Sequence, residues 1–140
     1  MNINPYLNFP GNTEEAFNFY KSVFGGEFTA LHRFEGQPGC DGFSEMDKNK
    51  IMHVSLPVGG SILMGTDVVE GMGQPFVEGN NISMSLNPQS RQQADTLFAA
   101  LSANGKPAMP MADAPWGDYF GMLTDQFGIN WLISYNENYK

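Results

Sequence analysis

Hydrophobic and polar positions follow the same order twice along this chain, in residues 2–26 and again in residues 80–105. Each stretch opens with a short extended run, continues through a polar turn and ends in a segment whose apolar residues recur at helical spacing. The two helical segments match position by position. Four apolar residues of the second segment each lie 78 positions after an apolar residue of the first, beginning with Ala94 after Ala16. The pattern predicts one strand-turn-helix motif used twice.

Polar residues at the start of both helical segments support this assignment. Asn12 is followed three positions later by Glu15, and Ser90 by Gln93. This spacing is typical of a capping box, in which the first side chain accepts a hydrogen bond from a backbone amide of the first turn. Glycines follow both segments, as left-handed helix ends prefer, so we expect each helix to end just before them.

Strand signals follow the first helix. Residues 27–34 are rich in apolar, β-branched and aromatic residues, and a Gly/Pro-rich loop follows at residues 35–42. Residues 50–66 hold two such runs on either side of Gly59-Gly60, and a two-residue Gly-Gly turn is a strong hairpin signal. Residues 1–67 are therefore predicted to form a β-α-β-β-β unit.

The second half repeats this order of elements. Residues 68–79 lack periodicity and are predicted to link the two units. Residues 80–136 form the second unit, whose last two strands are predicted to make a hairpin around Phe127-Gly128. The predicted fold class is α+β, with both units in one domain that spans residues 1–140.

Composition and charge indicate which classes of partner are excluded and where the protein is expected to be located. The net charge is −8 with only 7 Lys and Arg, so no basic stripe is present to neutralise phosphates, and we expect neither nucleic acid nor an anionic membrane as partner. No apolar run approaches the about 20 residues of a membrane-spanning helix, and the N-terminal residues do not resemble a signal peptide. The single cysteine, Cys40, fits a reducing compartment, so a cytoplasmic location is expected.

Two motifs carry a family resemblance. One is the helix end NFYKSVFGG at residues 18–26, and the other is the pattern Trp116-Gly117, Thr124-Asp125-x-Phe127-Gly128 and Trp131. With the order of elements, they resemble the glyoxalase/bleomycin-resistance/dioxygenase superfamily (the vicinal oxygen chelate fold), and specifically its PhnB-like branch. The resemblance covers nearly the whole chain. It implies two four-stranded sheets that curve around a shared cleft with helices outside, and often a homodimer.

The first hairpin predicts which side chains face that cleft. A two-residue turn at Gly59-Gly60 places Ser55 opposite Met64, and His53 opposite Thr66, on one sheet face. The other face of this hairpin is apolar enough to meet the helix. We therefore expect these four side chains to face the cleft.

The same reasoning applies to the second hairpin. A two-residue turn at Phe127-Gly128 places Leu123 opposite Leu132 on the cleft face, and leaves Trp131 in the core. The loop before this hairpin carries Trp116, and the strand that follows it carries Tyr119 and Phe120 near its start; the three rings could form an aromatic wall over a ligand. The alternative is that these rings only pack a loop onto the sheet.

The first strand of each unit completes the predicted site. Residues 81–87 alternate polar and apolar, so the polar row that includes Asn81 and Ser83 is expected to face the cleft, or else bulk solvent. In the first unit the corresponding row includes Leu7 and Phe9. The predicted ligand-binding residues are Leu7, Phe9, His53, Ser55, Met64, Thr66, Asn81, Ser83, Trp116, Tyr119, Leu123 and Leu132.

The resemblance also implies where a metal would bind. Metal-dependent members of the superfamily place ligands on the first and last strands of each unit, and those positions are filled here by Pro5, Met64, Asn81 and Leu132. Pro and Leu cannot ligate a metal, a thioether is too soft for Fe, Mn, Ni or Zn in such sites, and Asn is a weak donor. We therefore expect no metal at these positions and no cofactor, which argues against metal-dependent glyoxalase or dioxygenase activity.

Other candidates for chemistry are few. His53 is the best general acid/base, because imidazole titrates near neutral pH; the alternative is a structural histidine bonded to Ser55 or Thr66. His32 lies on a different predicted strand, and two histidines do not define a catalytic metal site. Asp125 is expected to organise its turn rather than catalyse.

The expected function is the binding of a small molecule in a metal-free cleft, similar in principle to bleomycin-resistance proteins. One alternative is a lyase or isomerase that uses His53 or a metal at non-standard positions. Another is a purely structural or regulatory dimer. Some PhnB-like sequences carry a methyltransferase label, but this chain has no glycine-rich strand-to-helix turn of the kind that a nucleotide-type methyl donor needs.

Overall fold

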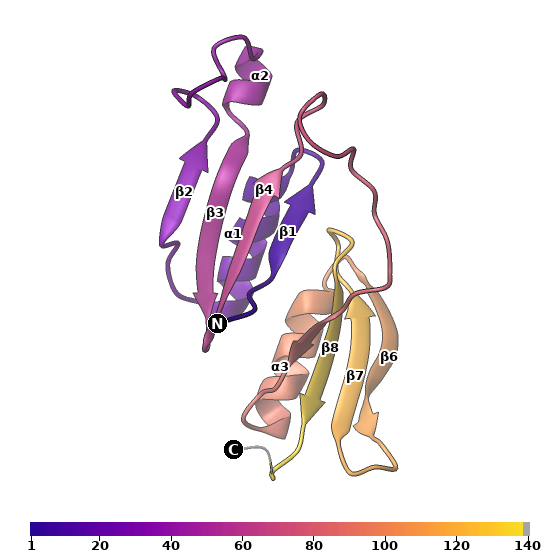
Figure 1. The fold of residues 1–140 in the computed structure, drawn as a ribbon. Helices are drawn as coiled ribbons and strands as arrows, with labels where there is room; N and C mark the ends of the chain where they lie inside the picture. The colour runs from indigo at the N-terminus through magenta and orange to yellow at the C-terminus, as the bar shows by residue number, and fades with distance from the viewer. Residues whose placement is uncertain (139–140) are drawn as a thin grey trace. The chain divides into compact units, whose positions relative to one another are not determined.

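The computed structural model describes residues 1–138 and contains two compact units, Met1–Val77 and a second unit that begins at Glu78. Each unit holds one four-stranded sheet and one long helix that packs against one face of it (Figure 1). The first unit consists of β1 (Tyr6–Phe9), α1 (Thr13–Phe24), β2 (Ala30–Arg33), α2 (Glu45–Lys48), β3 (Ile51–Val58) and β4 (Ser61–Asp67). The second consists of β5 (Met84–Leu86), α3 (Arg91–Ser102), β6 (Lys106–Asp113), β7 (Tyr119–Thr124) and β8 (Asn130–Tyr135).

Both sheets have the same topology. The strand orders are β1-β4-β3-β2 and β5-β8-β7-β6, and in each sheet the first strand pairs in parallel with the last one of its unit while the other pairs are antiparallel. The predicted α+β fold of two repeated β-α-β-β-β units is confirmed. The short helix α2, which Ser44 caps through a 3.1 Å bond from the Asp47 amide to its Oγ, was not predicted.

One of the two predicted helix caps is present. Ser90 Oγ accepts a hydrogen bond from the Gln93 amide at 3.0 Å, as expected. The predicted cap of α1 is wrong, because the Asn12 side chain makes no capping hydrogen bond. The Thr13 amide at the start of α1 instead donates to Asp67 Oδ1, 2.9 Å away at the end of β4. A side chain from the sheet therefore satisfies a donor that we expected a local residue to satisfy.

Each unit has its own apolar core between helix and sheet. In the first unit, Phe17 of α1 meets Phe9 and Tyr20 in edge-to-face contacts with ring centroids 6.5 and 5.6 Å apart. In the second unit, Leu101 of α3 and Trp131 are both buried, and the prediction that Trp131 is a core residue is confirmed. None of the helices within residues 1–138 has the length and apolarity needed to span a membrane.

The two hairpins test the predicted strand registers. The first register is confirmed, since Ser55 lies opposite Met64. The second is wrong by one residue, since Leu123 lies opposite Trp131 and Met122 opposite Leu132. A shift of one residue changes which side chains share a sheet face.

The error in the second register comes from its turn. Asp125 and Ile129 still pair through a backbone bond of 2.8 Å, so the turn holds three residues rather than two. Asp125 Oδ1 accepts from the amides of Phe127 and Ile129, and Gly128 adopts a φ of 89° that favours glycine. The prediction that Asp125 organises the turn is confirmed.

Candidate functional site

The face of the first sheet that lies opposite α1, here called the first open face, carries most of the predicted site residues of this unit. Strand register places Met64 beside Ser55 on this face, and alternation along β3 and β4 adds His53 and Thr66. Ser55 is buried among its neighbours, and the other three side chains are partly exposed. The first open face is thus a mixed surface of hydroxyl, thioether and imidazole groups.

The predicted places of Leu7 and Phe9 on this face are wrong. Phe9 makes its ring contact with Phe17 of α1, and Leu7 pairs with Gly65, where an added Cβ would lie 2.5 Å from the Phe17 ring. Both side chains are buried on the helix side. The residue of β1 that faces the open side opposite Met64 is Tyr6, which was not predicted because the alternation assigned to this short strand was wrong.

Tyr6 forms a hydrogen-bonded pair with His53. The Tyr6 hydroxyl lies 3.0 Å from His53 Nδ1, and the two ring centroids are 5.6 Å apart. Partial burial raises the pKa of the Tyr6 phenol, which is protonated at neutral pH as phenols ordinarily are. The expected alternative partners of His53 are engaged elsewhere, since Ser55 Oγ lies 2.8 Å from Thr29 Oγ1 and Thr66 Oγ1 donates to the Met52 carbonyl at 2.8 Å.

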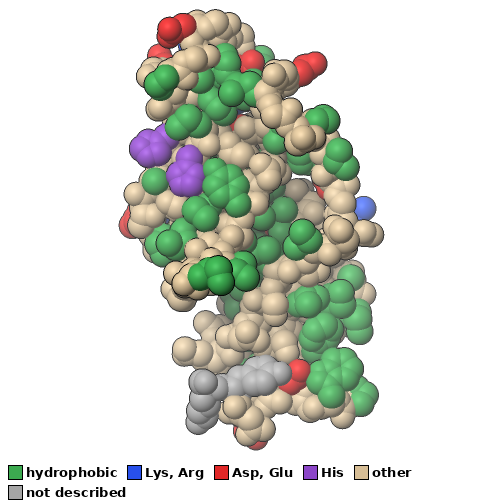
Figure 2. Space-filling view, in the orientation of Figure 1, with side chains coloured by type: hydrophobic (Ala, Val, Ile, Leu, Met, Phe, Trp, Pro, Cys, Tyr) green, Lys and Arg blue, Asp and Glu red, His purple; other side chains and the backbone are tan. Residues whose placement is uncertain are grey.

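The second histidine lies next to the first. β2 and β3 pair so that His32 stands directly opposite His53, and Figure 2 shows the two imidazoles together on one face. The two are 21 positions apart on different predicted strands, so the sequence pattern did not indicate that they are neighbours. Only the pairing of β2 with β3, which the sequence pattern did not specify, brings them together.

The face of the second sheet opposite α3, the second open face, has a similar mixture. Leu132 lies here between Ser85 of β5 and Met122 of β7, and Leu132 and Met122 alternate with residues that are buried. Asn81 and Ser83 are exposed but precede β5, so they have no strand partner in the register. Leu132 is thus where the sequence predicted it, on the side away from the helix.

Two predicted site residues of this unit face α3 instead. Leu123 is buried opposite Trp131, because the register differs from the predicted one. Tyr119 donates its hydroxyl hydrogen to Asp95 Oδ1 of α3 at 2.6 Å, and the guanidinium of Arg91 lies 3.9 Å from the ring centroid. This hydrogen bond to Asp95 raises the pKa of Tyr119. Both side chains hold the helix on the sheet and do not line the second open face.

Trp116 and Phe120 remain as the aromatic pair predicted beside the sheet. Their ring centroids are 5.9 Å apart in an edge-to-face arrangement, and Trp116 is 65% exposed. Trp116 Nε1 donates to Asp118 Oδ2 at 2.9 Å, while Asp118 Oδ1 accepts from the Asn136 amide group. These bonds fix the loop, and Phe120 shares the second open face with its strand partner Ser134.

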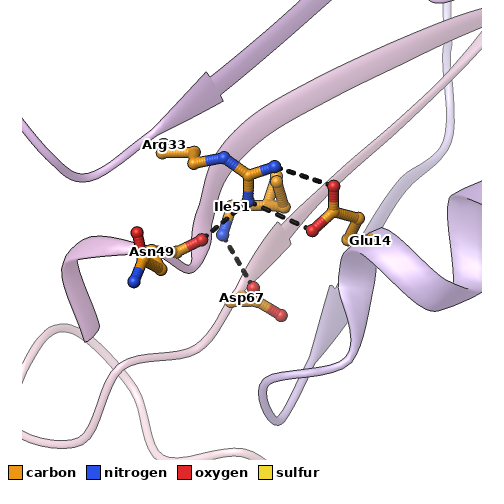
Figure 3. Close-up of polar contacts among 5 residues, drawn as sticks. All are labelled: Glu14, Arg33, Asn49, Ile51 and Asp67. Carbon is orange, nitrogen blue, oxygen red and sulfur yellow. Dashed lines mark hydrogen bonds and ion pairs between the residues drawn. The ribbon is translucent and has the colours of Figure 1, made fainter. Parts of the chain in front are cut away.

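Three charged residues of the first unit, Glu14, Arg33 and Asp67, form a group of polar contacts on the helix side of the sheet, here called the brace (Figure 3). The Arg33 guanidinium donates to both carboxylate oxygens of Glu14 on α1, at 2.7 and 3.1 Å, and to the Asn49 carbonyl at 2.8 Å. Asp67 Oδ2 accepts from the Ile51 amide at 2.8 Å, which complements its bond to the start of α1. The brace ties α1 to β2, β3 and β4 and keeps these charges off the first open face.

A separate hollow of about 290 Å³ lies between Pro10 and the loop formed by residues 68–76. Its wall is mostly apolar, with Glu70 and Gln74 as the polar side chains. This volume is at the lower limit of small-molecule pockets, which usually combine apolar walls with several converging polar groups. The open faces offer more of the chemistry expected of a binding site.

The positions that correspond to the superfamily's metal ligands can now be placed. Pro5 precedes β1, and the β1 residue opposite Met64 is Tyr6. The Tyr6 phenol, which is hydrogen-bonded to His53, and the Met64 thioether are both poor ligands for a hard or borderline divalent metal. Within residues 1–138, no group of three or more His, Cys, Asp or Glu side chains is placed to hold a metal ion.

The fold defines the class of protein. A glyoxalase/bleomycin resistance protein from Albidiferax ferrireducens has the same fold, with a TM-score of 0.60 at 19% identity over 94% of this chain and 97% of that one. This confirms that the protein has the glyoxalase-like fold of the superfamily that the two sequence motifs resemble.

The family follows from closer matches. The family model described as 3-demethylubiquinone-9 3-methyltransferase matches residues 1–134, and the chain belongs to this family. Protein PA1353 from Pseudomonas aeruginosa is 37% identical, with a TM-score of 0.86 over 97% of this chain and 98% of that one. The PhnB protein from Bacillus cereus is 27% identical, with a TM-score of 0.75 over 96% and 99%. The chain is therefore a member of the PhnB-like branch.

Proposed function

We propose that this protein binds a small molecule on the open faces of its two sheets. The observation that carries the proposal is the composition of these faces, where Met64 and Leu132 lie among small polar side chains that neither helix covers. Binding sites for small molecules are usually apolar surfaces with a few well-placed polar groups. The cleft shared by the two units stays a prediction from the family resemblance.

The proposed binding does not use a metal at the superfamily's ligand positions. The first-unit positions were assigned to Pro5 and Met64, and Leu132 occupies a position on β8; the β1 residue opposite Met64 is Tyr6. Leu132 cannot ligate a metal, and the Tyr6 hydroxyl is held by His53. A neutral, adaptable surface of this kind suits an uncharged or aromatic ligand, because thioether side chains can adjust to its shape.

An enzymatic function is the second candidate, and the Tyr6–His53 hydrogen bond favours it. The Tyr6 hydroxyl 3.0 Å from Nδ1 orients the imidazole, whose other nitrogen could exchange a proton with a substrate as the general acid/base of a lyase or isomerase. If an activity is found, His53→Ala should lower kcat by about 100-fold or more. Turnover that is unchanged in this variant would remove the enzymatic candidate.

Methyl transfer, which the description of the family names, is not part of this proposal. The two strand-to-helix turns, residues 10–12 and 87–90, hold a single glycine, Gly11, and neither has a glycine-rich sequence. Nucleotide-type cofactors are usually held at such turns by backbone amides that only glycine-rich loops expose. The sequences of these two turns therefore argue against a bound methyl donor.

We also propose that the protein is a cytoplasmic homodimer. The family resemblance motivates the dimer, which would form through a sheet edge or by exchange of units, and the free thiol of Cys40 fits a reducing compartment. Light scattering on the purified protein at micromolar concentration should give twice the chain mass. A monomer at that concentration would contradict the dimer.

Ligand binding can be tested with a thermal-shift screen of small aromatic and apolar compounds. Compounds that raise the melting temperature are then titrated against the variant Met64→Lys, which places a charge on the first open face. The control is Met46→Lys in α2, where the side chain is 75% exposed and lies outside either sheet. We expect Met64→Lys to weaken binding at least tenfold and Met46→Lys to leave it unchanged. Equal affinity in both variants would contradict the proposed site.

A further inference from the structure

We propose that His32 and His53 form a binding site for a divalent transition-metal ion, of the class Cu²⁺, Ni²⁺ or Zn²⁺, on the first open face. These residues lie on β2 and β3, whereas the superfamily's metal ligands lie on the first and last strands of each unit. The inference goes beyond small-molecule binding and does not depend on it. It also revises the expectation, drawn from the sequence, that the two histidines act separately.

The strand register gives the two imidazoles the spacing that a shared metal requires. His32 and His53 are direct partners in the antiparallel pair of β2 and β3. Side chains of such partners leave the same sheet face with Cβ atoms about 4.5–5.5 Å apart. A metal bound about 2 Å from each ring nitrogen needs those nitrogens about 3 Å apart, which rotation of two neighbouring imidazoles can provide.

The contact with Tyr6 suits His53 to this role when Nδ1–H donates to the Tyr6 oxygen, because the unprotonated Nε2 can then ligate. Metal-binding histidines usually bond their second ring nitrogen to an oxygen, which fixes the ring and leaves the first nitrogen free to ligate. In this structure the Tyr6 hydroxyl lies 3.0 Å from Nδ1, so Nε2 is the nitrogen that faces away from this contact. Tyr6 is thus a positioning residue for the proposed site and not a ligand.

The surroundings allow a cation to approach. His32 is exposed and His53 is partly exposed. The guanidinium next in sequence, Arg33, is held 2.7 Å from the Glu14 carboxylate on α1, on the other side of the sheet. The remaining side chains of the first open face on the neighbouring strands are uncharged, and the chain carries a net charge of −8. No repulsion from these neighbours opposes a divalent cation, and the overall charge attracts it.

Two imidazoles leave coordination positions for water, so the bound metal should exchange readily. Sites with nitrogen ligands prefer Cu²⁺ to Ni²⁺ and Zn²⁺, following the general order of divalent metal affinities. The expected site is therefore one that a chelator empties and that micromolar Cu²⁺ refills.

The proposal can be tested by titrating the full-length protein, without a histidine tag and after chelator treatment, with Cu²⁺ and separately with Zn²⁺ at pH 7.5. Isothermal titration calorimetry should show one Cu²⁺ per chain, bound more tightly than Zn²⁺. The electron paramagnetic resonance spectrum of the Cu²⁺ complex should show coupling to two imidazole nitrogens.

Substitutions test which residues bind the metal ion. His32→Ala, at an exposed position that should not affect folding, is expected to weaken Cu²⁺ binding at least tenfold and to remove one imidazole from the spectrum. Tyr6→Phe should weaken binding about tenfold while the two-nitrogen spectrum remains, as for other partners of metal ligands. Asn8→Ala, on β1 beside the site, is the matched control and should change nothing. Binding of unchanged affinity in His32→Ala, or a spectrum without imidazole in the wild type, would overturn the proposal.

Discussion

At the scale of single residues, buried carboxylates fix the backbone in both units. Asp67 accepts hydrogen bonds from the amides of Thr13 and Ile51, which are 38 positions apart in the sequence. Asp125 accepts from two amides of its own turn and, through Oδ2, from the Trp131 indole at 2.8 Å. The role of Asp125 could be predicted because its partners are local, whereas that of Asp67 could not, because its partners come together only in the folded unit.

The ion pair between Glu14 and Arg33 gives a pH-dependent contribution to stability. The hydrogen bonds from Arg33 lower the pKa of Glu14 below its usual value of 4.5. A group with a lowered pKa stabilises the fold above its unfolded pKa, and this contribution is lost as the pH falls through the folded pKa. Because both side chains are more than a third exposed, the contribution should be about 0.3–1 kcal/mol.

We therefore expect Glu14→Gln to lower the free energy of unfolding by that amount at pH 7, and by much less near pH 3. Urea denaturation at both pH values measures the difference. The control is Glu15→Gln, a neighbouring exposed carboxylate in the same helical turn. An effect of Glu14→Gln that grows as the pH falls would contradict the assigned ion pair.

At the scale of elements, turn length decides how well side-chain faces can be predicted. The Gly59-Gly60 turn holds two residues, so the predicted register of β3 and β4 is correct and His53, Ser55, Met64 and Thr66 share a face. The second turn holds three residues, so the face assigned to Leu123 was wrong, although Leu132 lies on the predicted face.

The first strand of the chain was assigned the wrong alternation for a different reason. β1 is four residues long, and both of its faces carry aromatic side chains, Tyr6 on one and Phe9 on the other. A hydrophobic pattern this short does not distinguish the buried face from the open one. The consequence was that Tyr6, the hydrogen-bond partner of His53, was missed.

Close approach of helix and sheet in the second unit gives a prediction about two glycines. A Cβ on Gly105, just after α3, would lie 2.5 Å from the Thr124 carbonyl oxygen, which is backbone and cannot move aside. A Cβ on Gly121 would meet Met111 Sδ at 2.5 Å and the Phe98 ring at 3.0 Å, which are side chains that can adjust.

Gly105→Ala should therefore destabilise the protein by about 2–3 kcal/mol and Gly121→Ala by about 1–2 kcal/mol. Gly42→Ala is the control, because a Cβ there meets nothing within 4 Å and its φ is not positive. The free energies of unfolding from urea denaturation give the comparison. The reverse order for Gly105 and Gly121 would contradict the packing described for α3.

At the scale of the whole molecule, the repeat of one motif was the most predictable feature. The spacing of apolar residues in the two helices and the Gly-Gly turn were sufficient to predict two β-α-β-β-β units, and the same topology is present in both sheets. The chemistry was less predictable, because it depends on pairs such as His32 with His53 that only the pairing of strands creates. Sequence patterns specify each strand more strongly than they specify its partner.

The proposed small-molecule site lies on the open faces and not elsewhere on the protein. Methionine methyl groups can report this, because Met64 and Met122 lie on the open faces while Met46 lies in α2. The most direct measurement is a two-dimensional NMR spectrum of protein labelled with ¹³C at the methionine methyl groups, recorded with and without a compound from the thermal-shift screen. We expect the signals of Met64 or Met122, or both, to shift in proportion to saturation while that of Met46 stays in place. Shifts confined to Met46, or to methionines outside both open faces, would contradict it.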